Sequence, residues 1–270
     1  MQTVYVRLLT IIFAIIAFIG ITTDNAFAAE PDWSNNVIRV TGQGAAPNLS
    51  NAAQARMLAR RAAVADAYRQ LAESIKGVNV DAETTVENMM VTSDVIRTKV
   101  SATIQGAQII NEKEIPGGGY EVTMTVPLFG VQNSLAKAVM PVPQIKEPIP
   151  TPTVTIPSSG GYTGLIIDCR GLGLKPVMSP VIKNDIGQPI YGYKNLDPDK
   201  VIAQGMASYC YSTSDTAATR AGSNPLVVKA VSLEGVYRGN PVVSAADANK
   251  ILAENNVSHF LENTNVVFIR

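Results

Sequence analysis

The chain has 270 residues, and its 22 lysines and arginines balance its 22 aspartates and glutamates, so its formal net charge is zero. A nucleic-acid-binding protein usually carries a basic excess that neutralises phosphates, and this balance argues against nucleic acid as a partner. Two cysteines and one histidine exclude a disulfide-dense scaffold and a cysteine-rich zinc module, and they argue against a histidine-based catalytic or metal site.

The first 28 residues have the pattern of an export signal. Arg7 supplies a positive charge, residues 8–21 form an apolar run shorter than the ~20 residues that span a bilayer, and residues 26–28 (Ala-Phe-Ala) have the small-x-small pattern of a cleavage site. We expect cleavage between Ala28 and Ala29, which leaves a chain without a transmembrane segment. We therefore expect a periplasmic, extracellular or outer-membrane-associated protein; an uncleaved membrane anchor is the alternative.

Residues 29–140 are expected to form a first domain that opens with a strand and a long helix. Alternation between two faces predicts the strand over residues 37–42. The helix is expected to start at a cap at Asn48 or Ser50 and to end near Lys76, where Gly77 can adopt the left-handed conformation. Its expected apolar stripe consists of residues spaced three or four apart: Leu58, Ala62, Ala65, Tyr68, Ala72 and Ile75.

The rest of the first domain is expected to be a meander of strands. Residues 95–110 are strand-like in parts, and residues 107–115 and 120–126 flank a Pro-Gly-Gly-Gly segment at 116–119 that favours a hairpin. Residues 128–139 are compatible with a short closing helix. These elements predict an α+β domain in which a helix covers an antiparallel sheet.

A proline-rich segment at residues 141–160 separates the two halves. It holds six of the chain's 16 prolines, which favours an extended, semi-rigid spacer; a loop fixed across the surface of one domain is the alternative. Residues 161–270 then predict a second α+β domain with strands at 164–168 and 266–269. The overall expectation is two small domains, each an antiparallel sheet packed with one or two helices, joined by a Pro-rich linker.

Local signals in the second domain mark a hairpin and two helix starts. Residues 184–187 (Asn-Asp-Ile-Gly) lie between two apolar segments and predict the hairpin turn. Asp197, followed by Pro198, predicts the start of one helix, and Ser244 predicts the start of another.

Short alanine- and glycine-rich motifs occur in a fixed order between residues 36 and 130. They are Gly42-x-Gly44 after the strand, the alanine-rich residues 62–71, residues 75–78, residues 100–107 and the strand at 121–126. In this order they resemble the Lpp-twenty lipoprotein family, and they are similar to the N-terminal domain of flagellar assembly protein T. The resemblance implies a bacterial envelope protein with a small α+β domain capable of self-association, and it carries over no catalytic residue. No cysteine lies near the expected cleavage site, so this chain departs from the lipid-anchored members.

Few side chains stand out as candidates for a site. Cys169 and Cys210 could form a disulfide in an oxidising compartment, worth ~4 kcal/mol for a loop of this length, or remain two buried thiols. Asp168 and Arg170 lie at a strand end just before glycines and are the best candidates for a ligand contact; a pair that fixes the turn is the alternative. His259 has no second histidine with which to form a site.

These observations predict no catalytic residue, no cofactor and no metal ligand. We expect a non-enzymatic envelope protein with a structural or protein-interaction role, whose partners are envelope proteins or further copies of itself. A link to the flagellar or outer-membrane apparatus follows only from the resemblance. A small-ligand or glycan-binding module in the C-terminal half is the alternative, and an exported hydrolase is the least favoured reading.

Overall fold

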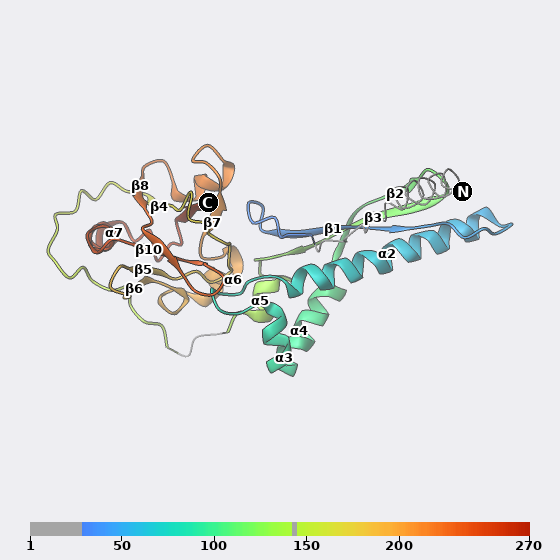
Figure 1. The fold of residues 1–270 in the computed structure, drawn as a ribbon, viewed down its shortest axis with the longest axis horizontal. Coiled ribbons are helices and arrows are strands. Elements are labelled where there is room, and N and C mark those ends of the chain that lie inside the picture. Colours follow the sequence, from blue (N-terminus) through green and yellow to red (C-terminus); the bar gives the residue numbers. More distant parts are fainter. Residues whose placement is uncertain (1–28, 142–144) are drawn as a thin grey trace, which may run out of the picture.

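The computed structural model describes residues 29–141 and 145–270, which fold into two halves that each combine helices with a sheet (Figure 1). This arrangement confirms the predicted α+β class and the two-part layout. The predicted export signal, with Ala28 of its cleavage site, lies outside the described residues. Within the described residues, no helix is long and apolar enough to cross a membrane.

The N-terminal half is a three-stranded antiparallel sheet with a long helix along one face (Figure 1). Its strand order is β1 (Val37–Gly44), β3 (Gly119–Pro127) and β2 (Gln108–Ile115), so β1 and β2 are the two edges. The predicted hairpin is confirmed as β2 and β3. Helix α2 (Ala52–Lys76) begins at Asn51, whose side chain accepts hydrogen bonds from two backbone amides of the first turn.

Two glycines of β1 let α2 approach the sheet very closely. A Cβ atom added to Gly42 would lie 2.3 Å from the carbonyl oxygen of Ala63 and 2.3 Å from the amide nitrogen of Ala67. A Cβ added to Gly44 would lie 2.1 Å from the carbonyl oxygen of Ala59. Glycine on the strand and alanine on the helix are therefore both required for this packing.

The predicted apolar stripe of α2 was wrong about which face packs on the sheet. Of its members only Ile75 is fully buried, and Leu58 is 39% exposed. The buried face consists of Ala55, Ala59, Ala63, Ala67, Leu71, Ser74 and Ile75, and the glycines meet it at Ala59, Ala63 and Ala67. Close approach to β1 selects the smallest side chains, whereas the prediction weighted larger ones. Gly77 ends the helix with φ −75° rather than in the left-handed conformation.

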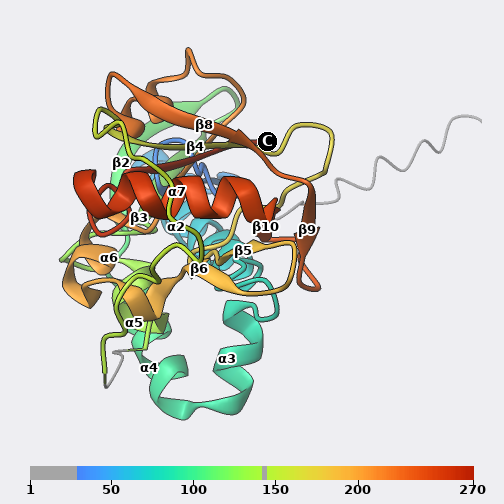
Figure 2. The same cartoon turned by 90° about the vertical axis from the view of Figure 1, so that its left-hand side faces the viewer.

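The strand-like interpretation of residues 95–110 was also wrong, because most of this segment is helix α4 (Asp94–Gln105). The side chain of Ser93 accepts a hydrogen bond from the amide of Ile96 and starts the helix. Together with α3 (Val86–Thr92), α4 forms a helical pair that stands away from the sheets (Figure 2). The predicted closing helix is present as α5 (Leu135–Val139).

The C-terminal half contains a four-stranded sheet whose strands are all parallel, where an antiparallel sheet was expected. Its order is β7 (Ser208–Cys210), β11 (Val266–Ile269), β4 (Gly164–Asp168) and β8 (Pro225–Lys229). No two strands adjacent in this sheet follow one another directly along the chain. The long connections between them allow the crossovers that parallel pairing needs.

A second four-stranded sheet has the order β6 (Pro189–Tyr191), β5 (Ile182–Asn184), β10 (Asn240–Val243) and β9 (Ser232–Glu234). The predicted hairpin is confirmed as the antiparallel pair of β5 and β6. Four helical segments complete this half: η1 (Tyr193–Asn195), α6 (Pro198–Gln204), η2 (Thr216–Ala221) and α7 (Ala245–Ser258). The predicted caps Asp197 and Ser244 start α6 and α7.

The two halves pack directly against each other. The amide of Met178 donates to the carbonyl oxygen of Asn79 over 3.0 Å, which joins the backbones of the two halves. The ring of Trp33 meets the ring of Tyr209 edge to face, with 5.6 Å between ring centres. Buried apolar side chains of both halves belong to one continuous cluster, so the interface is part of the core.

Residues 145–160 of the proline-rich segment lie against the C-terminal half, as the hydrogen bonds of Asn195 to Pro148 and of Thr153 to Asn249 show, and they are not a free spacer. At its end the buried carboxylate of Glu254 accepts hydrogen bonds from the Ser158 hydroxyl (2.7 Å), the Ser159 amide (2.9 Å) and the Gly160 amide (3.1 Å). Burial alone would raise the pKa of Glu254, but these hydrogen bonds outweigh it and lower that pKa below its usual value. The surface-loop alternative therefore describes this segment better than a spacer does.

Candidate functional site

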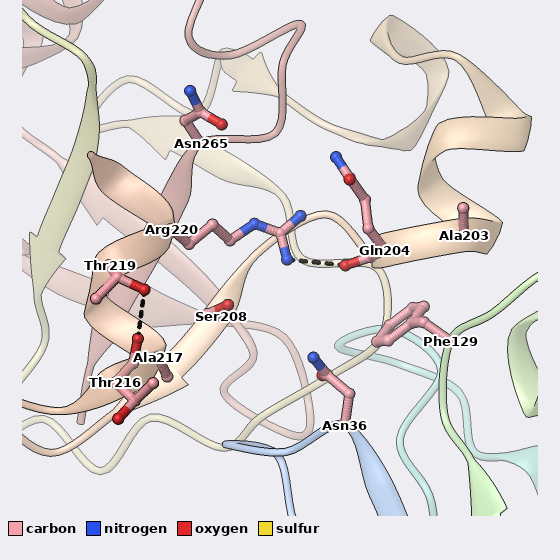
Figure 3. Close-up of a pocket in the computed structure, with 10 residues that line it drawn as sticks. All are labelled: Asn36, Phe129, Ala203, Gln204, Ser208, Thr216, Ala217, Thr219, Arg220 and Asn265. Carbon is pink, nitrogen blue, oxygen red and sulfur yellow. Dashed lines mark hydrogen bonds between the residues drawn. The ribbon is translucent and has the colours of Figure 1, made fainter.

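A cleft of about 480 Å³ opens where the two halves meet (Figure 3). This volume lies within the usual ~300–1,000 Å³ of small-molecule sites. Two of the residues that line it, Asn36 and Phe129, belong to the N-terminal half. The other eight belong to the C-terminal half: Ala203, Gln204, Ser208, Thr216, Ala217, Thr219, Arg220 and Asn265.

The parallel sheet positions one wall of the cleft. Ser208 is the first residue of β7, and Asn265 directly precedes β11. Because β7 and β11 run parallel, these two residues lie at the same end of the sheet, where both strands begin. The end of α6 at Gln204 and the turns of η2 complete the wall from the same half.

The N-terminal half contributes the opposite wall through the paired ends of β1 and β3. Asn36 precedes β1 and adopts a left-handed backbone with φ 55°, a conformation that asparagine tolerates well. Its carbonyl oxygen accepts a hydrogen bond from the Leu128 amide over 2.8 Å. Phe129 follows immediately, and its ring faces the cleft (Figure 3). Strand pairing thus brings together two residues that lie far apart in the sequence.

Arg220, at the centre of the cleft, is held by backbone and hydroxyl oxygens. Its guanidinium donates to the carbonyl oxygens of Thr264 (2.6 Å), Gln204 (2.8 Å) and Gly205 (2.6 Å), and to the Thr264 hydroxyl (2.8 Å). These contacts close the C-terminal end of α6, where orphan carbonyls favour a cation. Burial lowers the pKa of Arg220, but a guanidinium remains charged in proteins.

No acidic side chain lines this cleft. Within the described part of the chain, Arg220 has no carboxylate ion-pair partner, so its charge is offset only by the dipoles of carbonyl and hydroxyl groups. Six lining side chains are neutral and polar: Asn36, Gln204, Ser208, Thr216, Thr219 and Asn265. This composition suits hydrogen bonding to a ligand. It includes no base that could transfer a proton and no nucleophile activated by such a base.

The predicted ligand-contact pair, Asp168 and Arg170, lies at the carboxyl end of β4, away from this cleft. Arg170 Nη2 is 2.6 Å from Asp168 Oδ2, and the Arg170 amide donates to Asp168 Oδ1 over 3.0 Å. These contacts with Arg170 lower the pKa of Asp168. The pair thus closes the turn after β4, which is the structural alternative considered for it.

The structure places Cys169 and Cys210 too far apart for the disulfide considered from the sequence. Both are buried and free. Cys169 follows β4 and Cys210 ends β7, with β11 between the two strands. Strands two apart are separated by ~10 Å, whereas a disulfide requires Cα atoms within ~7 Å. Burial raises the pKa of Cys169 to about 12, so this thiol is unreactive.

The remaining polar candidates do not assemble into a site. His259 caps the end of α7 with φ 52°, and its Nδ1 atom lies 3.8 Å from a carboxylate oxygen of Glu262. In residues 29–141 and 145–270, no group of three histidine, cysteine, aspartate or glutamate side chains could hold a metal ion.

Sequence reasoning missed Arg220 altogether. Its neighbours Thr216, Ala217 and Thr219 form no recognised motif, and nothing in the local sequence distinguishes this arginine from an exposed one. Its environment is created by α6 and by the turn before β11, which approach it only in the folded chain.

Two family models match this chain, one in each half. Residues 31–127 match the LPP20 lipoprotein model, which confirms the resemblance seen in the sequence. Residues 164–270 match the model of the second domain of Treponema pallidum Tp0624. No curated protein matches the chain. The lipoprotein match supports an exported, envelope-associated protein.

Proposed function

We propose that this chain is a non-enzymatic protein of the bacterial cell envelope that acts by binding other proteins or further copies of itself. The match of residues 31–127 to a lipoprotein family supports the envelope as its location. A cleft lined by hydroxyl groups but by no carboxylate, histidine or other base that could activate them supports a binding role over a catalytic one. Placement in the periplasm or at the outer membrane, and a link to the flagellar apparatus, are the finer parts of this proposal.

The observation that carries the proposal is the open edge of β2. This strand pairs with β3 on one side and, within the described residues, with no strand on the other. Seven of its eight residues are exposed. Ile109 and Ile110 are 42% and 51% exposed beside a bulge. An exposed edge strand presents unpaired backbone groups to which another chain can add a strand.

Two exposed ion pairs link this edge to α2. Arg56 of α2 lies 2.9 Å from Glu114 of β2, and Arg60 lies 2.8 Å from Glu112. Each exposed pair contributes little stability on its own, typically ~0–1 kcal/mol. The ladder with β3 is what orders β2 in advance, and an edge that is already ordered lowers the entropy cost when a partner adds a strand.

The proposal is tested by photo-crosslinking in cells that produce the full chain. A photoreactive residue replaces Ile110 at the edge of β2, and a matched control replaces Val236, which is 73% exposed in the C-terminal half. We expect position 110 to give discrete adducts of defined mass, either of the chain with itself or with an envelope protein, and position 236 to give none. Absence of adducts at position 110, or the same adducts at both positions, would refute the proposal.

Ligand binding in the C-terminal half is a second candidate function, and the cleft around Arg220 favours it. A half-buried cation that has no carboxylate partner among the described residues, beside the unpaired side chains of Asn36 and Ser208, is more typical of a binding site than of a surface depression.

A further inference from the structure

The charge of the cleft indicates the sign of its ligand. A guanidinium has five N–H donors, and Arg220 uses four of them in the hydrogen bonds described above. One donor on Nη1 remains for a ligand. Because the surrounding oxygens belong to neutral groups, the net charge presented to the cleft is positive. A ligand with one negative charge would supply the counter-charge that the protein leaves out.

The polar side chains of the cleft indicate hydroxyl groups on that ligand. The side chains of Asn36 and Ser208 form no hydrogen bond with any other described residue, although Ser208 is only 7% exposed. An amide and a hydroxyl can each donate and accept, so together they match hydroxyl groups, which do the same. Gln204 and Asn265 each use their amide nitrogen within the protein, which leaves their carbonyl oxygens as acceptors.

The shape of the cleft indicates a ring-sized molecule. Phe129, which is 9% exposed, presents part of an aromatic side chain at one wall, with the small side chain of Ala203 on the same side and that of Ala217 across the cleft (Figure 3). A volume of about 480 Å³ accommodates one or two sugar rings and is larger than a simple inorganic anion requires.

We propose that the Arg220 cleft binds a small hydroxylated organic acid of the sugar-acid class. Arg220 pairs with the carboxylate, Asn36 and Ser208 bind hydroxyl groups, and Phe129 packs against the apolar face of the ring. This assignment rests on the ligand-binding candidate function and is independent of the interaction role of β2.

The test is isothermal titration calorimetry on residues 29–270 with three probes: glucuronate, glucose and inorganic phosphate. Glucuronate carries both features that the cleft requires, glucose lacks the charge, and phosphate lacks the ring. We expect glucuronate to bind saturably at one site, and glucose and phosphate to bind at least tenfold more weakly.

Variants locate the binding without disturbing the fold. Asn36→Gly and Ser208→Ala remove side chains that have no partner in the described chain, and glycine accepts the φ of 55° at position 36, so we expect nearly unchanged unfolding curves. Each should weaken glucuronate binding about fivefold, the usual effect of losing one hydrogen bond. Asn88→Ala on α3, an exposed position away from the cleft, is the matched control and should bind as the unmodified protein does.

Three results would overturn the assignment: no saturable binding of glucuronate, equal binding of glucose, or equal binding of phosphate. Binding that survives both cleft variants would also overturn it. Because crosslinking from β2 is measured separately, a failure here leaves the interaction role standing, and a failure there leaves this ligand site standing.

Discussion

Replacing Gly42 by alanine should separate α2 from the sheet. The added Cβ would lie 2.3 Å from backbone atoms of Ala63 and Ala67, whereas ordinary contacts begin at 3.4 Å. The difference, 3.4 − 2.3 = 1.1 Å, is the distance by which the helix must retreat, because backbone atoms cannot rotate away. A gap of ~0.5–1 Å already forfeits a quarter to a half of the dispersion energy of the atoms that line it. Overpacking costs ~1–3 kcal/mol, and a rigid backbone clash lies at the upper end, so we expect a loss of ~3 kcal/mol.

Urea unfolding of residues 29–270, followed by circular dichroism, measures this loss. Gly77→Ala is the matched control, because the nearest atom to its added Cβ is 3.7 Å away and its φ of −75° suits alanine. We expect the control to change the free energy of unfolding by less than ~1 kcal/mol, with a tendency to stabilise. If Gly42→Ala unfolds at the same urea concentration as the unmodified protein, the close helix–sheet contact is not what selects glycine here.

Three further predictions concern the interface, the thiols and the proline-rich segment. Trp33→Ala should lower the free energy of unfolding by ~3 kcal/mol and split the calorimetric transition in two, because it removes a buried ring that joins the halves at Tyr209; a single unshifted transition would contradict this. Cys169 and Cys210 should resist a thiol reagent in the native protein and react fully, without added reductant, in denaturant; a reductant requirement would indicate a disulfide. Since the pKa of Glu254 is lower folded than unfolded, its contribution is complete above the ordinary value of 4.5 and is lost as the pH falls. Relative to the intrinsic exchange rate at each pH, the Ser159 and Gly160 amides should therefore lose protection at acidic pH, and Glu254→Gln should lower their protection at neutral pH; equal protection in the variant would contradict this.

Elements with strong local signals could be predicted from the sequence. Asp197 followed by Pro198, and Ser244, start helices because their side chains satisfy the first free amides wherever the helix lies in the fold. The glycine-rich turn at 116–119 produces a hairpin for an equally local reason, since its residues supply the backbone conformations that a tight turn needs.

Features that depend on distant segments could not be predicted. The packing face of α2 is decided by Gly42 and Gly44 on another element. A prediction from hydrophobicity alone therefore placed Leu58 on the buried face, although it is exposed. Parallel pairing of β4 with β8 and β11 depends on crossovers that no local pattern records. The environment of Arg220 comes from three separated segments, so the sequence around it gives no sign of the binding role proposed for it.

The packing between the halves bears on how such a protein would work. The proline-rich composition of residues 141–160 predicts a semi-rigid spacer, yet the end of that segment is hydrogen-bonded to Glu254 of the C-terminal half, and the two halves share one core. A chain built this way presents the edge of β2 in a fixed orientation to the C-terminal half. Fixing that orientation in advance removes an entropy cost that two freely jointed domains would incur at each association. The proposed binding through β2 is therefore better served by a rigid body than by a flexible tether.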